Sequence, residues 1–256
     1  MTEFTPENTT VLKEKKEVSS STFSFVKVFL WLGLGLLLTG VVALGMPDLL
    51  TFIVKNTGMS AEGVSTLYIS LMVTAGVLMI PSIIIMNLKS WKPKSVWMTI
   101  SYVVYTLAMG VLLSNTFMFV FEYSLATDIS FIRTISTAFL ITAGCFLLMG
   151  LFAFLTKKNL NILLPLILTL LVGSLVISLV NFFIGSTFIY WMTDFIIFGV
   201  ILLVTAVDLY RIKKMVTSGA MNGSNNLALY AAYMLYVDFI NIFIRVLFYV
   251  LQRSRK

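Results

Sequence analysis

Residues 228–247 read ALYAAYMLYVDFINIFIRVL, and their length and apolar character fit a helix that crosses a lipid bilayer. Such a helix needs about 20 mostly apolar residues. Three side chains in the stretch are poorly solvated by hydrocarbon, namely Asp238, Asn241 and Arg245. Asn241 and Arg245 follow Asp238 by three and seven residues, so a helix places all three on one face. We therefore expect this helix to lie centrally, where protein covers its polar face.

The remainder of the chain has the same apolar character. Hydrophobic residues make up 59% of the 256 residues and charged residues only 11%, whereas about a quarter of the residues of soluble domains are charged. So few charges cannot cover a surface that faces water. Seven apolar stretches are long enough to span a bilayer: 28–47, 66–88, 96–121, 131–155, 160–185, 187–210 and 228–251. The sequence predicts an all-α integral membrane protein with seven transmembrane helices.

Composition divides the chain into a polar beginning and an apolar remainder. Residues 1–25 are polar and lack the apolar core of a cleavable signal sequence, so we expect a disordered cytoplasmic tail. Residues 26–256 are expected to form a single seven-helix transmembrane domain, because their length suits one helix bundle. A sequence poor in charge and without targeting signals favours a bacterial plasma membrane as the location.

Basic residues between the apolar stretches predict the orientation. Twelve of them fall on one side of the membrane if the helices alternate in direction: Lys13, Lys15, Lys16, Lys27, Lys89, Lys92, Lys94, Lys157, Lys158, Arg211, Lys213 and Lys214. The opposite loops contain only Lys55 and Arg133, so the N-terminus is expected to be cytoplasmic. The last stretch leaves two alternatives. A spanning helix puts the basic residues at the end of the chain outside, whereas a re-entrant hairpin keeps them inside.

The composition argues against several classes of function. The net charge of +7 lies in short runs beside apolar stretches, which is typical of topology signals and lipid-headgroup contacts and not of nucleic-acid binding. The chain has no histidine, which excludes histidine-based metal sites and histidine general bases. It also lacks an HExxH motif and a glycine-rich phosphate loop. Two aspartates could serve a membrane protease, but the flanking Tyr-Asp and Gly-x-Gly-Asp contexts are missing, so we expect neither an enzyme nor a resident cofactor.

Ionisable side chains at membrane depth mark the candidate site. Asp208, near the end of the sixth stretch, is either an interfacial carboxylate paired with Arg211 or nearby lysines, or part of a functional site. Asp238 lies about 15 Å into the last helix. It either forms an internal salt bridge with Arg245 or binds a proton or cation in a hydrated cavity. We favour the second interpretation, because intramembrane carboxylates are usually functional. Asp194, at the start of the sixth stretch, either lines an outer vestibule or lies at a solvated helix end, and we favour the second interpretation.

Three stretches carry a family resemblance. The chain has VDLYRIKK at 207–214, LYVDFIN at 235–241 and TAFLITAGCFLLMGLFAFLTKKNL at 137–160. An aspartate at the end of the sixth helix, followed by an apolar helix with Leu-Tyr-x-Asp-Phe-Ile-Asn, resembles the C-terminal signature of the Bax-inhibitor-motif family of membrane proteins. The stretch 137–160 is similar to the fourth helix of that family and its basic exit. The resemblance extends over residues 28–251.

The resemblance implies a fold and an activity. The fold has seven helices, with the seventh central and wrapped by two three-helix layers. The activity is a pH-sensitive calcium leak, gated by two aspartates that correspond to Asp208 and Asp238. Because two neighbouring carboxylates repel in a low dielectric, such a pair is expected to hold one proton over some pH range and, when ionised, to offer oxygen ligands to Ca²⁺. Asn241, Arg245 and Arg211 are expected to support the pair.

The family pattern is not matched everywhere, and a second function follows from it. The family often has an arginine ten residues after the motif aspartate, where this chain has Phe248. The partners implied by a leak are the lipid bilayer, Ca²⁺ and protons. Relatives can also act without conducting ions, by binding membrane proteins in quality control or in stress and cell-death pathways. In that alternative the tail and the loops carry the function.

Overall fold

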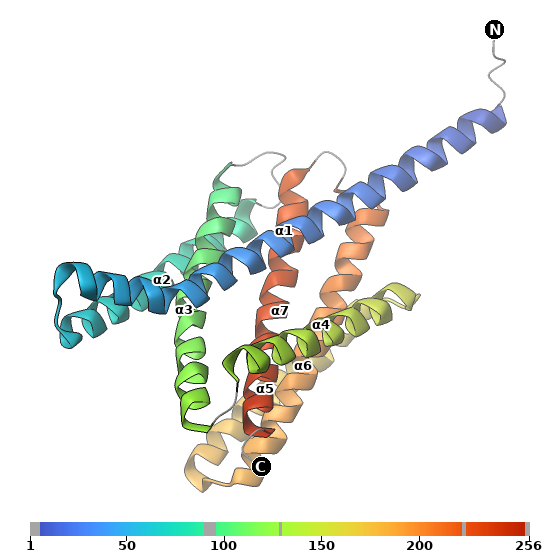
Figure 1. Ribbon diagram of the computed structural model, residues 1–256. Helices are drawn as coiled ribbons and strands as arrows, with labels where there is room; N and C mark the ends of the chain where they lie inside the picture. Colours follow the sequence, from blue (N-terminus) through green and yellow to red (C-terminus); the bar gives the residue numbers. More distant parts are fainter. Residues whose placement is uncertain (1–5, 90–95, 128–129, 222–223, 254–256) are drawn as a thin grey trace. The chain divides into compact units, whose positions relative to one another are not determined.

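The computed structural model describes residues 6–89, 96–127, 130–221 and 224–253, and the regular structure within them is helical (Figure 1). The helices are α1 (Pro6–Thr57), α2 (Ala61–Lys89), α3 (Val96–Thr127), α4 (Phe131–Leu155), the short 3-10 helix η1 (Leu160–Leu163), α5 (Leu164–Ile184), α6 (Thr187–Thr217) and α7 (Asn225–Arg253). Seven spans, one of them formed by η1 and α5 together, are long and apolar enough to cross a membrane. The prediction of an all-α protein with seven such helices is confirmed.

The outer surface of the helices is strongly apolar. Large hydrophobic side chains are exposed on each of the seven long helices, and α5 is the extreme case, with Phe182 81% and Phe183 80% exposed. Water does not solvate a continuous surface of this kind, whereas lipid chains do. The exposed apolar side chains are therefore the counterpart of the low charge content of the sequence.

The first helix extends further toward the N-terminus than the composition suggests. α1 begins at Pro6, within residues 1–25, for which the sequence predicts a disordered tail. Once a helical turn exists, each residue added to it closes one more backbone hydrogen bond, so an apolar helix can continue into a polar segment. The apolar part of the span begins only at Ser24.

The last helix is continuous. α7 runs from Asn225 to Arg253, a length of about 43 Å, and its sequence contains no glycine or proline. A hairpin inside the membrane would leave backbone groups at its turn without hydrogen bonds. The alternative of a re-entrant hairpin in the last stretch is therefore wrong. Arg255 and Lys256 lie outside the described residues.

Packing divides the chain into two compact units. The first comprises residues 1–128 and 215–233, and the second comprises residues 129–214 and 234–256. The sequence predicts one transmembrane domain over residues 26–256, and contacts between helices resolve two units within it. Both candidate aspartates, on α6 and on the later part of α7, belong to the second unit.

In the first unit, α1 and α3 approach closely at Gly110. A Cβ atom placed on Gly110 would lie 2.7 Å from the Cβ atom of Val42 and 3.0 Å from the carbonyl oxygen of Thr39. One turn earlier on α3, the carbonyl of Thr106 accepts a hydrogen bond of 2.9 Å from the Thr39 hydroxyl. A small residue thus lets two helix backbones meet, which is a common way of packing helices in membranes.

In the second unit, the end of α6 is anchored to the end of α4. The Nζ atom of Lys213 donates to the carbonyl oxygens of Phe154 and Thr156, at 2.7 Å and 3.4 Å. The last carbonyls of a helix point beyond its end, so a lysine that donates to them completes the end of α4. From α7, the ring of Phe239 packs on that of Phe146 in α4, with centroids 5.8 Å apart. These contacts position the parts of α6 and α7 that hold the candidate aspartates.

The close approach at Gly110 predicts a loss of stability on substitution. Gly110→Ala adds a methyl group where the nearest atoms are only 2.7 Å and 3.0 Å away, and overpacking of this kind destabilises proteins by about 1–3 kcal/mol. We expect a lower thermal unfolding midpoint for the purified protein in detergent. Gly76→Ala on α2, where no atom lies within 4 Å of the added carbon, is the matched control and should keep the wild-type midpoint. Equal midpoints for the two variants would contradict the close approach.

Candidate functional site: a carboxyl pair on α6 and α7

Asp238 is a buried carboxyl group with an incomplete set of hydrogen bonds. The residue is 5% exposed, and its Oδ2 atom has no hydrogen-bond partner within the described chain. Leu235, Tyr236 and Ile242, on the same part of α7, are completely buried. Buried polar atoms are nearly always hydrogen-bonded in proteins, so an unpaired carboxylate oxygen is a strong indication of a functional role.

Asp208, on α6, has a cation as its partner. Its Oδ1 atom lies 3.1 Å from Nη1 of Arg211, one turn further along the helix. The Nε atom of Arg211 also donates to Oδ1 of Asn161 in η1, at 3.3 Å. The Asp208 side chain is 13% exposed and that of Arg211 39%. Of the cations considered from the sequence, Arg211 therefore pairs with Asp208, whereas Lys213 contacts the end of α4.

The two carboxyl groups lie within electrostatic reach of each other. Thr205, one turn before Asp208, is completely buried and lies beside Asp238. The Thr205 hydroxyl donates to the carbonyl of Ile201, at 2.9 Å, inside its own helix. The site therefore combines two carboxyl groups and one guanidinium in a region largely withdrawn from water, and Coulomb interactions between them are weakly screened there.

Arg245 does not pair with Asp238. Its Nη1 atom donates to Oδ1 of Asp194 near the beginning of α6, and the Tyr249 hydroxyl donates to Oδ2 of the same carboxylate, at 2.6 Å. The internal Asp238–Arg245 salt bridge considered from the sequence is therefore wrong, because a carboxylate on the facing helix is within reach of Arg245. Asp194 lies in the first part of α6, where its side chain keeps 22% of its surface exposed and accepts from two partners.

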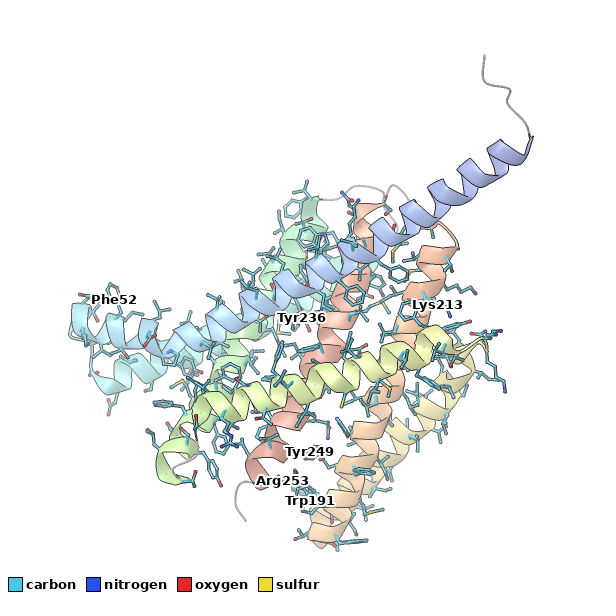
Figure 2. The ribbon with its side chains drawn as sticks, turned by 45° about the vertical axis from the view of Figure 1, so that its right-hand side comes forward. Phe52, Trp191, Lys213, Tyr236, Tyr249 and Arg253 are labelled. Atoms are coloured by element: carbon cyan, nitrogen blue, oxygen red, sulfur yellow. The ribbon has the colours of Figure 1, made fainter. Side chains whose placement is uncertain are left out.

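Asn241 is exposed and stands one turn from Asp238 in the direction of Arg245. The predicted supporting residues thus separate into two groups, with Arg211 at the carboxyl pair and Arg245 at the Asp194 cluster. Sequence reasoning missed Tyr249, and the available signal was its spacing of four residues from Arg245, which places both on one helix face. Figure 2 shows Trp191 and Tyr249 toward one end of the second unit and Lys213 toward the other.

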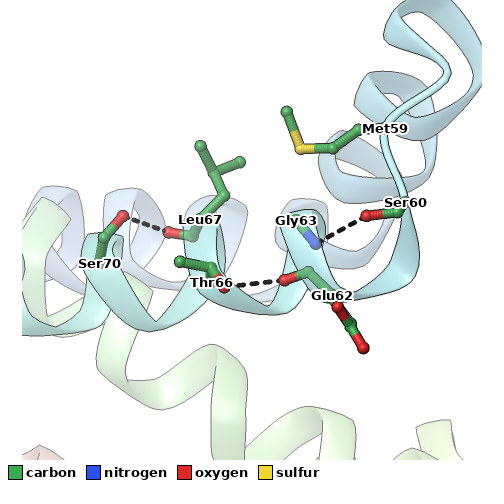
Figure 3. Close-up of a pocket in the computed structure, with 7 residues that line it drawn as sticks. All are labelled: Met59, Ser60, Glu62, Gly63, Thr66, Leu67 and Ser70. Carbon is green, nitrogen blue, oxygen red and sulfur yellow. Dashed lines mark hydrogen bonds between the residues drawn. The ribbon is translucent and has the colours of Figure 1, made fainter.

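The turn between α1 and α2 forms a separate hollow that lacks comparable chemistry. A cavity of about 580 Å³ is lined there by residues that include Ser60, Glu62, Thr66 and Ser70. Its hydroxyl groups serve the local backbone: Ser60 Oγ accepts from the N–H of Gly63, and Thr66 and Ser70 donate to carbonyls of the preceding turn (Figure 3). These hydroxyl groups are engaged in hydrogen bonds at the beginning of α2, and the hollow contains one carboxylate. Its polar groups are therefore explained by the start of a helix.

A resident metal is not supported by the donor groups of the described chain. Within it, no three residues of the types His, Cys, Asp and Glu come together to hold a metal ion. Ca²⁺ in proteins takes six to eight oxygen ligands, and two carboxyl groups supply at most four. The pair at Asp208 and Asp238 therefore suits a proton, or a cation that keeps most of its water.

Comparison with known proteins gives the family. Residues 23–255 match the family model described as inhibitor of apoptosis-promoting Bax1. The chain belongs to this family. The Escherichia coli inner membrane protein YbhL is 28% identical over 228 residues, which cover 86% of this chain and 88% of YbhL. A Borreliella burgdorferi protein is 32% identical over 159 residues, or 60% of this chain and 63% of its own. The family resemblance seen in the sequence is confirmed, and the protein is an integral membrane protein.

The Tyr249 hydrogen bond predicts a specific loss of stability. Tyr249→Phe removes a 2.6 Å bond to a carboxylate, and hydrogen bonds to charged groups contribute about 1.5–3 kcal/mol. We expect a lower thermal unfolding midpoint in detergent, measured by the loss of monodisperse protein on heating. Tyr190→Phe is the control, because Tyr190 is 58% exposed on the same end of α6. If Tyr249→Phe melted like Tyr190→Phe, the bond to Asp194 would contribute nothing measurable.

Proposed function

We propose that this protein is a passive, pH-sensitive cation leak of a bacterial plasma membrane, with Ca²⁺ as the conducted ion. The observation that carries the proposal is the buried carboxyl group of Asp238, with one oxygen unpartnered, within electrostatic reach of Asp208. Such a group is retained in a membrane helix at a considerable cost in insertion free energy, about 2.5–3.5 kcal/mol for a charged side chain at the centre of the membrane.

Protonation of the pair would control the contact between α6 and α7. When both carboxyl groups are ionised they repel each other, and one shared proton removes most of that repulsion. Arg211 offsets the charge of Asp208, at 3.1 Å, so the uncompensated charge is that of Asp238. The spacing of the two helices would then respond to pH, while ionised oxygens would attract a passing Ca²⁺ without holding it permanently.

The proposed architecture places α7 at the centre of the protein, wrapped by two three-helix layers. The burial of the helices supports this architecture. In the most apolar 18-residue stretch of α7, 56% of the residues are buried, against 11% in the corresponding stretch of the η1–α5 span. A helix that carries three strongly polar side chains gains most from such a position. The excess of basic residues in alternate loops supports a cytoplasmic N-terminus, and the E. coli relative is named an inner membrane protein.

A second candidate is a non-conducting interaction protein. The description of the family model, inhibitor of apoptosis-promoting Bax1, names an action on another protein, and this observation favours a binding role without enzymatic activity. In that case the aspartates serve helix packing, and the N-terminal segment and the loops contact the partner. Deletion of residues 1–25 separates the two candidates, because a leak should survive the deletion and a binding function of the segment should not.

The leak predicts a defined response in proteoliposomes. We expect Ca²⁺ entry that varies between pH 5 and pH 8 in the wild type. Asp208→Asn and Asp238→Asn each remove a titratable group from the pair, so the pH dependence should flatten in both, and the double variant should show the flattest profile. The fluorescence of a Ca²⁺ indicator trapped inside liposomes, recorded at each pH, measures the rate of Ca²⁺ entry.

Asp48→Asn is the matched control for this experiment. It is the same chemical change on an exposed carboxylate of α1, so its pH profile should follow the wild type. Unchanged leak and unchanged pH dependence in both pair variants would refute the assignment of the pair. Folded protein that shows no leak at any pH would favour the interaction protein.

A further inference from the structure

The second unit contains a cavity that the carboxyl pair does not account for. It has a volume of about 400 Å³ and lies between the first half of α6 and the second half of α7. Asp194, Ile201, Asn241, Arg245, Tyr249 and Gln252 are among the residues that line it. The lining combines a carboxylate, a guanidinium and two amides with apolar and aromatic side chains. The polar groups favour water or a polar solute in the cavity, because hydrocarbon would leave them unsolvated.

The cavity is aligned with the carboxyl pair. On α7, Tyr249, Arg245, Asn241 and Asp238 follow one another at spacings of four, four and three residues, which keeps them on one helix face. Asn241 lines the cavity, and Asp238 lies one turn before it in the chain. The cavity therefore leads toward Asp238 from the end of α7.

The same alignment holds on α6. Ile201 lines the cavity, Thr205 follows it by four residues and lies beside Asp238, and Asp208 follows Thr205 by three residues. The two helices thus carry the cavity and the carboxyl pair on the same two faces, in the same order.

The ion pair in the cavity places the Asp194 carboxylate beside the Arg245 guanidinium, so the positive charge of Arg245 is only partly offset. Asp194 accepts from Arg245 and from Tyr249, and Arg245 and Asp194 keep 25% and 22% of their side-chain surface exposed. Both bonds of the Arg245 guanidinium to Asp194 use Nη1. Tyr249 in turn stacks on Trp191, with ring centroids 6.5 Å apart. The cation is therefore held at a defined place in the cavity wall.

We propose that this cavity is the water-filled vestibule of the cation route, on the side away from Asp208, and that Arg245, held by Asp194, is the residue that limits entry of divalent cations. The statement about ions rests on the proposed leak, whereas the statement about water does not. A fixed positive charge in a narrow passage repels a divalent ion twice as strongly as a monovalent one. Asp194 weakens that repulsion and keeps Arg245 in position.

Charge substitutions then have opposite effects. Arg245→Gln leaves the negative charge of Asp194 in the cavity, Asp194→Asn leaves the positive charge of Arg245, and the double variant is neutral like the wild type. A unit charge within about 8 Å of the reacting group changes the local concentration of a monovalent ion on the order of tenfold at an intermediate dielectric. The double variant is the matched control for loss of the ion pair without a change of net charge.

Thiol accessibility tests the vestibule independently of conduction. Cys145, the single cysteine, is replaced by serine, and Asn241→Cys is introduced on the cavity wall. The purified protein is treated with a cationic and with an anionic methanethiosulfonate, both of which react only with thiols that water reaches. We expect both to modify Asn241→Cys. Ala206→Cys, at a completely buried position of α6, and Leu168→Cys, 63% exposed on the apolar surface of α5, should stay unmodified.

The ratio of the two reaction rates then reports the charge of the cavity. Relative to the parent, Arg245→Gln should raise the cationic-to-anionic ratio on the order of tenfold, Asp194→Asn should lower it, and the double variant should restore it. Gln252→Cys serves as a second probe if Asn241→Cys folds poorly. No modification at either probe, or a ratio that ignores these substitutions, overturns the vestibule.

Measurement of ion flux separates the proposed vestibule from the proposed leak. With a leak present, Arg245→Gln should increase Ca²⁺ entry several-fold over Na⁺ entry, and Asp194→Asn should reduce it. Charge-dependent thiol reactivity together with no ion flux in any variant would retain the vestibule and reject the leak. Flux that is unaffected by either substitution, in protein that shows the expected thiol reactivity, would reject Arg245 as the limiting residue.

Discussion

Hydrocarbon does not solvate polar groups, and the accommodation of each polar group in the spanning helices follows from this constraint. Backbone groups are satisfied by helix formation. Many hydroxyl groups are satisfied within their own helix, as when Thr142 donates to the carbonyl of Ala138 at 2.8 Å and Thr205 to that of Ile201 at 2.9 Å. Carboxyl and guanidinium groups have no such local solution, because their charge calls for an opposite charge or for water.

The three carboxyl groups of α6 and α7 are satisfied to different degrees. Asp194 has a guanidinium and a hydroxyl, Asp208 has a guanidinium, and Asp238 keeps one oxygen without a partner in the described chain. The number of hydrogen-bond and ion-pair partners therefore falls from Asp194 to Asp208 to Asp238. The fully paired group holds two helices together, and the group with the unpaired oxygen is the one to which we assign the proposed exchange of a proton or contact with an ion.

The departure of this chain from its family pattern has a structural consequence. The family often has an arginine ten residues after the motif aspartate, and here Phe248 occupies that position while Arg245 stands about one turn earlier. The shifted guanidinium reaches Asp194 on α6. Arg245 therefore lies in the cavity wall, and Asp208 has its counter-charge from Arg211 on α6.

The seven spans and their polar positions followed from the sequence alone, because apolar length and the expense of intramembrane charge are properties of each segment taken separately. The choice of partners did not follow from it. Arg245 is on the same helix face as Asp238, and spacing within one helix cannot reveal that Asp194 of another helix lies closer. The pairing of Asp194 with Tyr249, the position of Thr205 beside Asp238 and the cavity between α6 and α7 arise only when two helices pack at a particular register. Register depends on the shapes of all the side chains between the helices, and that information is not local to any stretch of sequence.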